Sequence, residues 1–250
     1  MLLSLLAASL QLASASPVSP RQWSNPYPPR TTAKFFTLIA NITDVDLAAA
    51  RFPDVAPPAS GWALTSVHVG AGLNAAVLSA THAPAGAGGL FQNGTARDIS
   101  ARATSIYLPP IQNSNGDFTP WGVQFSNANG GNGNGAGGSG DVTMNFGTAT
   151  IGAGVEGGLR NPYAEAFGPA GYYPDGGKFV VCYQAAPFYG RPQYRVMYLG
   201  EVPENCVAVR LLAQCAQEPE GGLKGAKELN LVNEGVGCYE DVSGIEWGLY

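Results

Sequence analysis

The sequence predicts an all-β fold, namely a single antiparallel β-sandwich or barrel with long loops rich in glycine and proline. Eight short segments alternate apolar and polar residues or are rich in β-branched and aromatic side chains, and turn residues separate them. The 34 glycines and 19 prolines leave few runs long enough for a helix. A hydrophobic content of 45% provides enough apolar surface for a folded core.

The predicted strands begin shortly after residue 33 and continue to residue 211. They are 35–40, 63–69, 105–108, 121–125, 142–146, 178–183, 194–199 and 207–211. Short helices are compatible with the sequence only at 45–50, 74–80 and 226–231. Residues 127–140, NANGGNGNGAGGSG, have no apolar surface to bury, so we expect a mobile loop between two strands.

The first fifteen residues, MLLSLLAASLQLASA, predict export. The run is uncharged, apolar and too short to span a bilayer, and it ends in Ala13-Ser14-Ala15, which predicts cleavage after Ala15. The expected organisation is a signal peptide (1–15), a proline-rich flexible leader (16–33), a β-rich module (34–212) and a disulfide-tethered extension (213–250). We therefore expect a secreted, extracellular or cell-wall-associated protein with no membrane anchor.

Four cysteines, Cys182, Cys206, Cys215 and Cys238, predict two disulfides in an exported chain. Three connectivities are possible, and we favour the sequential pairing, Cys182–Cys206 and Cys215–Cys238. Each bond would then close a loop of about 25 residues and contribute about 3 kcal/mol. A metal site is not expected, because no C-x-x-C pair occurs and neither histidine is near a cysteine.

Two sequons, Asn41-Ile42-Thr43 and Asn93-Gly94-Thr95, predict N-glycosylation of Asn41 and Asn93. If both asparagines carry glycans, they should lie on solvent-facing loops or at strand ends.

The charge pattern argues against a nucleic-acid partner. The formal net charge is −5, and no lysine or arginine occurs between residues 103 and 155. Residues 70–75, GAGLNA, fit a nucleotide-binding loop of the type G-x-G-x-x-G/A, but the same pattern recurs at 133–138 and 152–157. No acidic residue follows at the required spacing, so we interpret this segment as a turn and expect no cofactor.

No catalytic residues are predicted. G-x-S-x-G is absent, His68 lies within an alternating strand pattern, and His82 lies in a loop. A pair of carboxylates dispersed in the sequence would still permit glycoside hydrolysis, which is the enzymatic alternative.

Aromatic side chains are the most informative surface candidates. Ten of them lie between Tyr163 and Tyr198, where they either fill the core or form a face that stacks on sugar rings. Glycine and proline flank two pairs, Tyr172-Tyr173 and Phe188-Tyr189, which we expect to be exposed and to stack on glycans.

Several segments together resemble an uncharacterised family of small secreted proteins of filamentous ascomycete fungi. They are HVGAGLNAAVL (68–78), FQNGT (91–95), PWG (120–122), VVC (180–182), RPQY (191–194) and PENC (203–206). The resemblance covers about residues 35–212 and implies a secreted β-rich module in which Cys182 and Cys206 are bonded. It implies no activity, and this chain departs from the pattern at Ala75, where an acid is usual, and at 183–185, where tryptophans are usual.

These observations lead us to expect a non-catalytic secreted glycoprotein. The favoured role is binding an extracellular polysaccharide or another cell-wall component. The alternatives are a hydrolase with dispersed carboxylates and an effector-like module that binds a protein.

Overall fold

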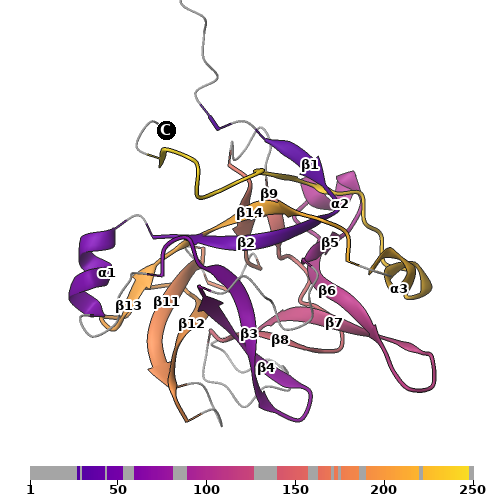
Figure 1. Cartoon of the computed structure of the whole chain (residues 1–250), viewed down its shortest axis with the longest axis horizontal. Coiled ribbons are helices and arrows are strands. Elements are labelled where there is room, and N and C mark those ends of the chain that lie inside the picture. Colours follow the sequence, from indigo (N-terminus) through magenta and orange to yellow (C-terminus); the bar gives the residue numbers. More distant parts are fainter. Residues whose placement is uncertain are drawn as a thin grey trace, which may run out of the picture.

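The protein is built mostly from antiparallel strands (Figure 1). The structure, a computed structural model, describes residues 27–247 apart from 29, 43, 53–58, 81–88, 127–139, 157–162, 170–171, 174–175, 186–189 and 220–221. The strands are β1 (Thr31–Ala33), β2 (Phe35–Asn41), β3 (Ala63–Gly70), β4 (Leu73–Ser79), β5 (Phe91–Asn93), β6 (Ser105–Gln112), β7 (Phe118–Phe125), β8 (Val142–Phe146), β9 (Gly154–Glu156), β10 (Glu165–Phe167), β11 (Lys178–Ala185), β12 (Pro192–Leu199), β13 (Cys206–Ala208), β14 (Arg210–Ala216) and β15 (Val236–Cys238). The helices are α1 (Val45–Arg51), α2 (Ala96–Ser100) and α3 (Gly222–Glu228).

Within the described ranges, thirteen strands form one bent sheet, and the other two, β1 and β15, pair with each other. The main path runs β5-β6-β7-β8-β4-β3-β2-β14-β10-β9, and the β11–β12 hairpin joins it through β4. No backbone ladder between the end strands β5 and β9 is found in the described part of the chain. Instead, the side-chain oxygen of Gln92 on β5 accepts a hydrogen bond from the Val155 amide on β9 at 2.6 Å. The antiparallel all-β prediction is confirmed, and the strand path does not close into a barrel.

Almost every strand contributes to one large core. Strand β2 is a nearly continuous apolar run because both of its faces are buried. Phe36 packs into the main core, and Phe35 packs into a second cluster with Phe91 and Tyr107. A strand that is buried on both faces has no solvent side on which polar residues would alternate. The longest ladder beside it pairs all seven residues of β2 with β14.

All eight predicted strand segments are strands, although 207–211 is interrupted at Val209, whose amide bonds to Phe179 instead. The helix expected at 74–80 is wrong, because this segment is strand β4, buried on both faces. Residues 31–33, expected in the flexible leader, form β1, and β14 continues through the boundary expected at residue 212. Residues 127–139 of the glycine-rich loop expected at 127–140 lie outside the described residues, so its expected mobility stays a prediction. The strands on either side of it, β7 and β8, pair with each other.

Helix α1 and the β11–β12 hairpin lie together at one end of the molecule, and α3 lies at the opposite end (Figure 1). Helix α3 overlaps the predicted helix at 226–231 but begins earlier. Of the helices that the structure describes, none has the length and apolar character needed to cross a bilayer.

Candidate functional site

The β11–β12 hairpin carries a row of side chains that runs from the core to the surface. Residues directly opposite each other on antiparallel strands lie on the same face. The three pairs in this row are Phe179 with Tyr198, Val181 with Val196, and Tyr183 with Tyr194. The first two pairs belong to the core, whereas in the third pair Tyr194 is 4% exposed and Tyr183 is 38% exposed.

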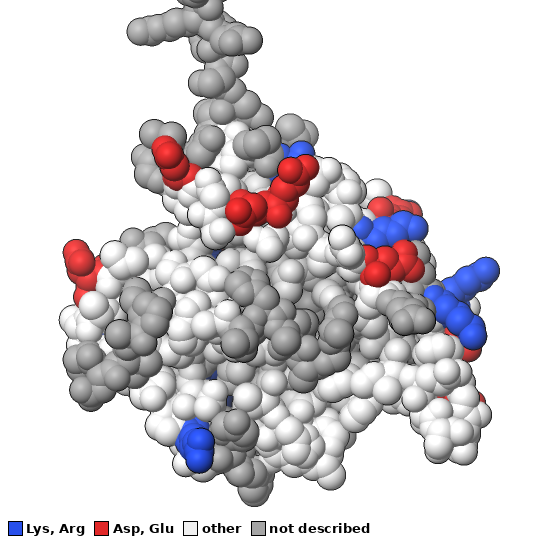
Figure 2. Space-filling model, viewed as in Figure 1, with Lys and Arg blue, Asp and Glu red and all other residues white. Residues whose placement is uncertain are grey.

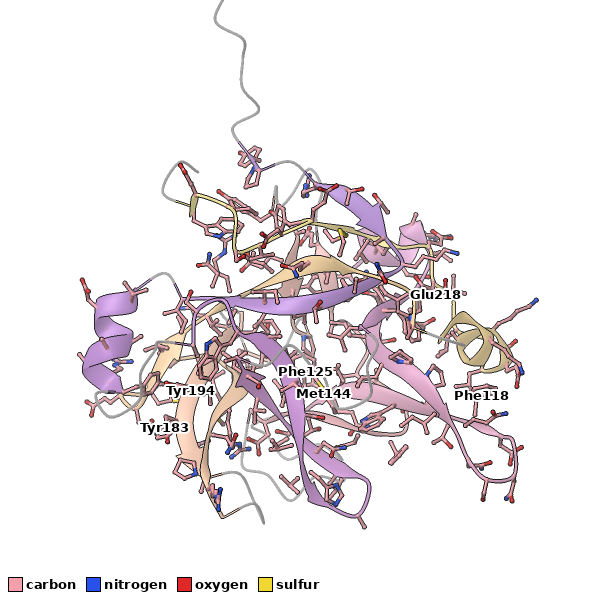
Figure 3. The ribbon with its side chains drawn as sticks, viewed as in Figure 1. Phe118, Phe125, Met144, Tyr183, Tyr194 and Glu218 are labelled. Carbon is pink, nitrogen blue, oxygen red and sulfur yellow. A yellow bond between two sulfur atoms is a disulfide. The ribbon has the colours of Figure 1, made fainter. Side chains whose placement is uncertain are left out.

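Four aromatic rings meet at the surface end of this row, and we call them the tyrosine cluster: Phe52, Trp62, Tyr183 and Tyr194. The Tyr194 ring lies 5.6 Å from Phe52 and 5.2 Å from Trp62, both in edge-to-face geometry, and 5.2 Å from Tyr183. Figure 3 shows Tyr183 and Tyr194 side by side next to α1. Phe52 directly follows α1, and Trp62 directly precedes β3.

The hydroxyl of Tyr194 is buried and has no hydrogen-bond partner among the described residues. A buried hydroxyl without a partner destabilises a protein by about 1–3 kcal/mol. Burial raises the pKa of the Tyr194 phenol, and the neighbouring Tyr183 adds to that rise, so the hydroxyl stays protonated at neutral pH. The cluster therefore combines an exposed ring, on Tyr183, with a neutral hydroxyl that has hydrogen-bonding capacity to spare.

The residues predicted to stack on glycans do not form this cluster. Tyr172 and Tyr173 are half-buried against the main core, which corrects the expectation that they form an exposed pair. The Tyr173 hydroxyl donates to the Tyr198 carbonyl at 2.8 Å, so it is already used within the protein. Phe188 and Tyr189 lie outside the described residues.

Sequence reasoning placed Tyr183 and Tyr194 in the aromatic-rich region but did not separate them from core residues. It also missed Phe52 and Trp62, which lie more than a hundred residues earlier in the chain. Only the cross-strand register of β11 and β12, combined with the position of α1, brings the four rings together.

Comparison with known proteins places these features in a family. A model for a domain of unknown function, DUF7907, matches residues 33–215. The chain belongs to the DUF7907 family. The whole tyrosine cluster lies within the DUF7907 region, as does the first pair of cysteines, Cys182 and Cys206. A curated relative, "Antigenic protein SchS34" of the filamentous fungus Stachybotrys chartarum, is 27% identical over 94% of this chain and 99% of its own length. No solved structure gave a significant match.

Both disulfides of the favoured sequential pairing are present in the structure. Cys182–Cys206 joins β11 to β13, with 4.2 Å between the Cα atoms, and Cys215–Cys238 joins β14 to β15 at 5.2 Å. The first bond lies inside the DUF7907 region. The second ties the last residue of that region to the segment that follows it.

Two carboxylates, Glu156 and Glu165, lie close together within the DUF7907 region, but each forms an ion pair with an arginine. Glu156 on β9 lies directly opposite Glu165 on β10. Arg102 forms an ion pair with Glu156, while Nε and Nη2 of Arg210 donate to Oε2 of Glu165 at 3.1 and 2.9 Å. A hydrolytic pair needs one group that protonates the leaving oxygen and another that attacks or activates water. Because each carboxylate here is held by an arginine, this pair gives the hydrolase alternative no support.

Two other motifs of the DUF7907 region have structural roles. GAGLNA (70–75) spans the end of β3, a two-residue turn and the start of β4, and in the turn Gly72 has a φ of +70° that favours glycine. His68 is exposed on β3 opposite Asn74, and His82 lies outside the described residues. In the described part of the chain, no three His, Cys, Asp or Glu side chains are grouped so that they could hold a metal ion.

Both sequon asparagines are the last residues of strands, as expected, but neither is freely exposed. Asn41 at the end of β2 is 9% exposed, and Thr43 lies outside the described residues. Asn93 at the end of β5 is half-buried, and its side-chain oxygen accepts from the Val232 amide at 2.8 Å. A glycan on either residue would require its side chain to turn outward, and glycosylation stays a prediction.

Proposed function

We propose that this protein is a secreted, non-catalytic module that binds an extracellular glycan at the tyrosine cluster. The observation that carries this proposal is the buried Tyr194 hydroxyl, which lacks a partner, beside the partly exposed ring of Tyr183. A sugar presents an apolar ring face, which can stack on the exposed Tyr183 ring, and hydroxyls for hydrogen bonds. The Tyr194 hydroxyl is buried in the free protein, so the proposal requires that the rings covering it shift when the sugar binds and let a sugar hydroxyl reach it.

The surroundings suit a neutral ligand. Figure 2 shows that most of the described surface on this face of the molecule is uncharged, although the residues of the cluster are not marked in it. Arg51, the nearest cation along the chain to Phe52, is already engaged by the backbone carbonyls of Pro203 and Cys206. Recognition would therefore rest on stacking and on neutral hydrogen bonds rather than on ion pairing.

Three observations support an extracellular location. The apolar leader predicts export, and two disulfides are typical of proteins from oxidising compartments. The Stachybotrys relative is named as an antigenic protein, which suits a protein that reaches the outside of the cell.

The proposal is tested with the purified mature protein on an array of neutral oligosaccharides, including chitin, glucan and mannan fragments, followed by calorimetry on the fragments that bind. Tyr183→Ala should weaken binding about tenfold, because the stacking ring is lost. Tyr194→Phe should weaken binding about twofold to tenfold yet raise the free energy of unfolding by about 1 kcal/mol, since an unpartnered buried hydroxyl is removed. These opposite signs separate a binding role from a structural one.

Tyr173→Phe is the matched control. It also removes one tyrosine hydroxyl, but that hydroxyl bonds to the Tyr198 carbonyl, so stability should fall by about 1 kcal/mol with binding unchanged. Phe146→Ala tests a second ring, which is 45% exposed and stacked on Trp121 at 5.0 Å. Failure of every glycan to bind would refute the proposal, as would full affinity in Tyr194→Phe or loss of binding in Phe146→Ala alone.

A further inference from the structure

We infer that the Cys182–Cys206 disulfide and Arg51 together hold the rings of the tyrosine cluster in their relative positions. The disulfide fixes the strand that carries Tyr183, and Arg51 ties the helix that precedes Phe52 to the loop closed by the same disulfide. As a statement about ligand affinity this inference rests on the proposed function, whereas as a statement about the cluster's geometry it stands on the contacts alone.

The disulfide acts on one side of the cluster through its position on β11. Cys182 directly precedes Tyr183, and in the β11–β13 ladder it lies opposite its own partner, Cys206. Three residue pairs hold the short strand β13 to β11. The disulfide therefore supplies the covalent link that keeps β13 in place beside the tyrosine-bearing strand.

Arg51 acts on the other side, through helix α1. It is the last residue of α1, and its Nη1 donates to the carbonyl oxygens of Pro203, at 3.1 Å, and Cys206. Both acceptors belong to the segment between Cys182 and Cys206 that the disulfide closes. The next residue along the chain is Phe52, whose ring lies 5.6 Å from Tyr194 and 6.4 Å from Tyr183.

Among the described residues, helix α1 is attached to the rest of the protein mainly at Ala48 and along β13. It is seven residues long, which is too short for a stable isolated helix, and Ala48 is its one buried residue. The hydrogen bonds of Arg51 and the packing of Phe52 therefore hold the C-terminal end of α1 in its position. If these bonds are lost, Phe52 should move away from Tyr194, and one wall of the proposed site should loosen.

The second disulfide provides a matched control within the same molecule. Cys215–Cys238 spans 23 residues and Cys182–Cys206 spans 24, so the two bonds restrict the unfolded chain to nearly the same extent. Cys215–Cys238, however, joins β14 to β15, and neither strand carries a residue of the tyrosine cluster. Removing it should lower stability without disturbing the cluster.

The experiment compares four variants of the full mature protein: Arg51→Ala, Arg51→Lys, the double variant Cys182→Ser/Cys206→Ser, and the double variant Cys215→Ser/Cys238→Ser. The readouts are affinity for the oligosaccharide that binds the wild type most tightly, and hydrogen exchange of backbone amides 46–52. We expect Arg51→Ala and Cys182→Ser/Cys206→Ser to weaken binding at least fivefold and to speed exchange in α1. Arg51→Lys keeps a donor and should restore part of the affinity, and Cys215→Ser/Cys238→Ser should leave both readouts unchanged.

Equal loss of affinity in the two double variants would overturn the inference, because it would show that the disulfides act only through overall stability. Unchanged affinity together with unchanged exchange in Arg51→Ala would overturn it as well, and this single variant decides the matter if a double variant does not fold. If the wild type binds no oligosaccharide, the proposed function fails, while hydrogen exchange in α1 still tests the positioning role of Arg51 and the disulfide.

Discussion

Thr95 completes the sequon of Asn93, yet in the folded chain it caps a helix. Its hydroxyl donates to Oδ2 of Asp98 at 2.7 Å and accepts from the Asp98 amide, while Oδ2 also accepts from the Thr95 amide at 2.9 Å. This reciprocal capping box satisfies backbone amides at the start of α2 that have no partner within the helix. Thr95 of the N-G-T triplet therefore stabilises the start of α2 whether or not Asn93 carries a glycan.

The capping box predicts a pH-dependent stability that belongs to Asp98. The Thr95 hydroxyl, followed by the Thr95 amide, lowers the pKa of this carboxyl in the folded protein. A lowered folded pKa means that the stabilisation is present above the ordinary aspartate pKa and is lost as the pH falls through the lowered value. The stability difference between wild type and Asp98→Asn, measured by urea unfolding, should stay constant near neutral pH and shrink in acid. A difference that does not change with pH would contradict this assignment, and Glu240→Gln, at an exposed position, is the control.

At the level of elements, a buried ion pair joins the start of β8 to β12. Arg195 Nη2 lies 2.5 Å from Oδ1 of Asp141, and the backbone of Asp141 bridges to Met197 on β12. Burial raises the pKa of Asp141 above its ordinary value, and the Arg195 charge opposes part of that rise. Each charge is stabilised mainly by the other, because neither side chain is substantially exposed to water.

The mutual dependence of Asp141 and Arg195 predicts a non-additive pair of substitutions. Asp141→Ala should lower the free energy of unfolding by about 3 kcal/mol, since it leaves the Arg195 charge buried without a partner. The double variant Asp141→Ala/Arg195→Met should lose less than the single variant, because no unpaired charge remains. Denaturant midpoints measured with unchanged slopes provide the test, and strictly additive losses would show that the two charges are not coupled.

For the whole molecule, the segment after the DUF7907 region is part of the core rather than an appendage. Val236, Cys238, Tyr239 and Val242 are all buried, and the Tyr239 hydroxyl accepts from the Ala164 amide at 3.1 Å. Gln214 on β14 forms a backbone bridge with Tyr239. The region matched by the family model therefore needs residues from outside that region to cover its interior.

Truncation tests this dependence. A chain that ends at residue 219, with Cys215→Ser to avoid a free thiol, should lose cooperative thermal unfolding. Each large buried apolar side chain contributes about 1.5–3 kcal/mol, and total stabilities are only about 5–15 kcal/mol. Tyr239→Phe keeps the ring and should lose only about 1 kcal/mol. A truncated chain that unfolds cooperatively near the wild-type temperature would show that the segment is dispensable.

The sequence predicted strands well where alternation or β-branched runs were strong, as in β3 and β12. It failed at β4, where Ala75 and Ala76 favour a helix locally, because pairing with β3 and burial on both faces override that preference. Strands of three residues, such as β5, β9 and β10, are too short to show an alternation of apolar and polar residues in the sequence. They are stabilised by hydrogen bonds to the neighbouring strands.

The candidate site was less predictable than the fold. Composition indicated the aromatic-rich hairpin, but whether a tyrosine is core or surface depends on its position in the ladder. Tyr198 and Tyr183 differ in this way: the β11–β12 ladder places Tyr198 at its buried end, whereas Tyr183 lies near its exposed end and reaches solvent. Phe52 reaches the site because Arg51 anchors α1 to a distant loop, and no local pattern encodes that contact.

The pairing of β1 with β15 has a consequence for biosynthesis. Thr31–Ala33 is synthesised long before its partner, Val236–Cys238, because most of the described chain lies between them. The first strand must therefore stay unpaired while most of the described chain is synthesised, whereas Cys215 needs only 23 further residues before Cys238 is present. Such distant contacts slow folding and leave apolar segments open to aggregation in the meantime. We expect the β1–β15 pair to form late in folding, after the segment that contains β15 has been synthesised.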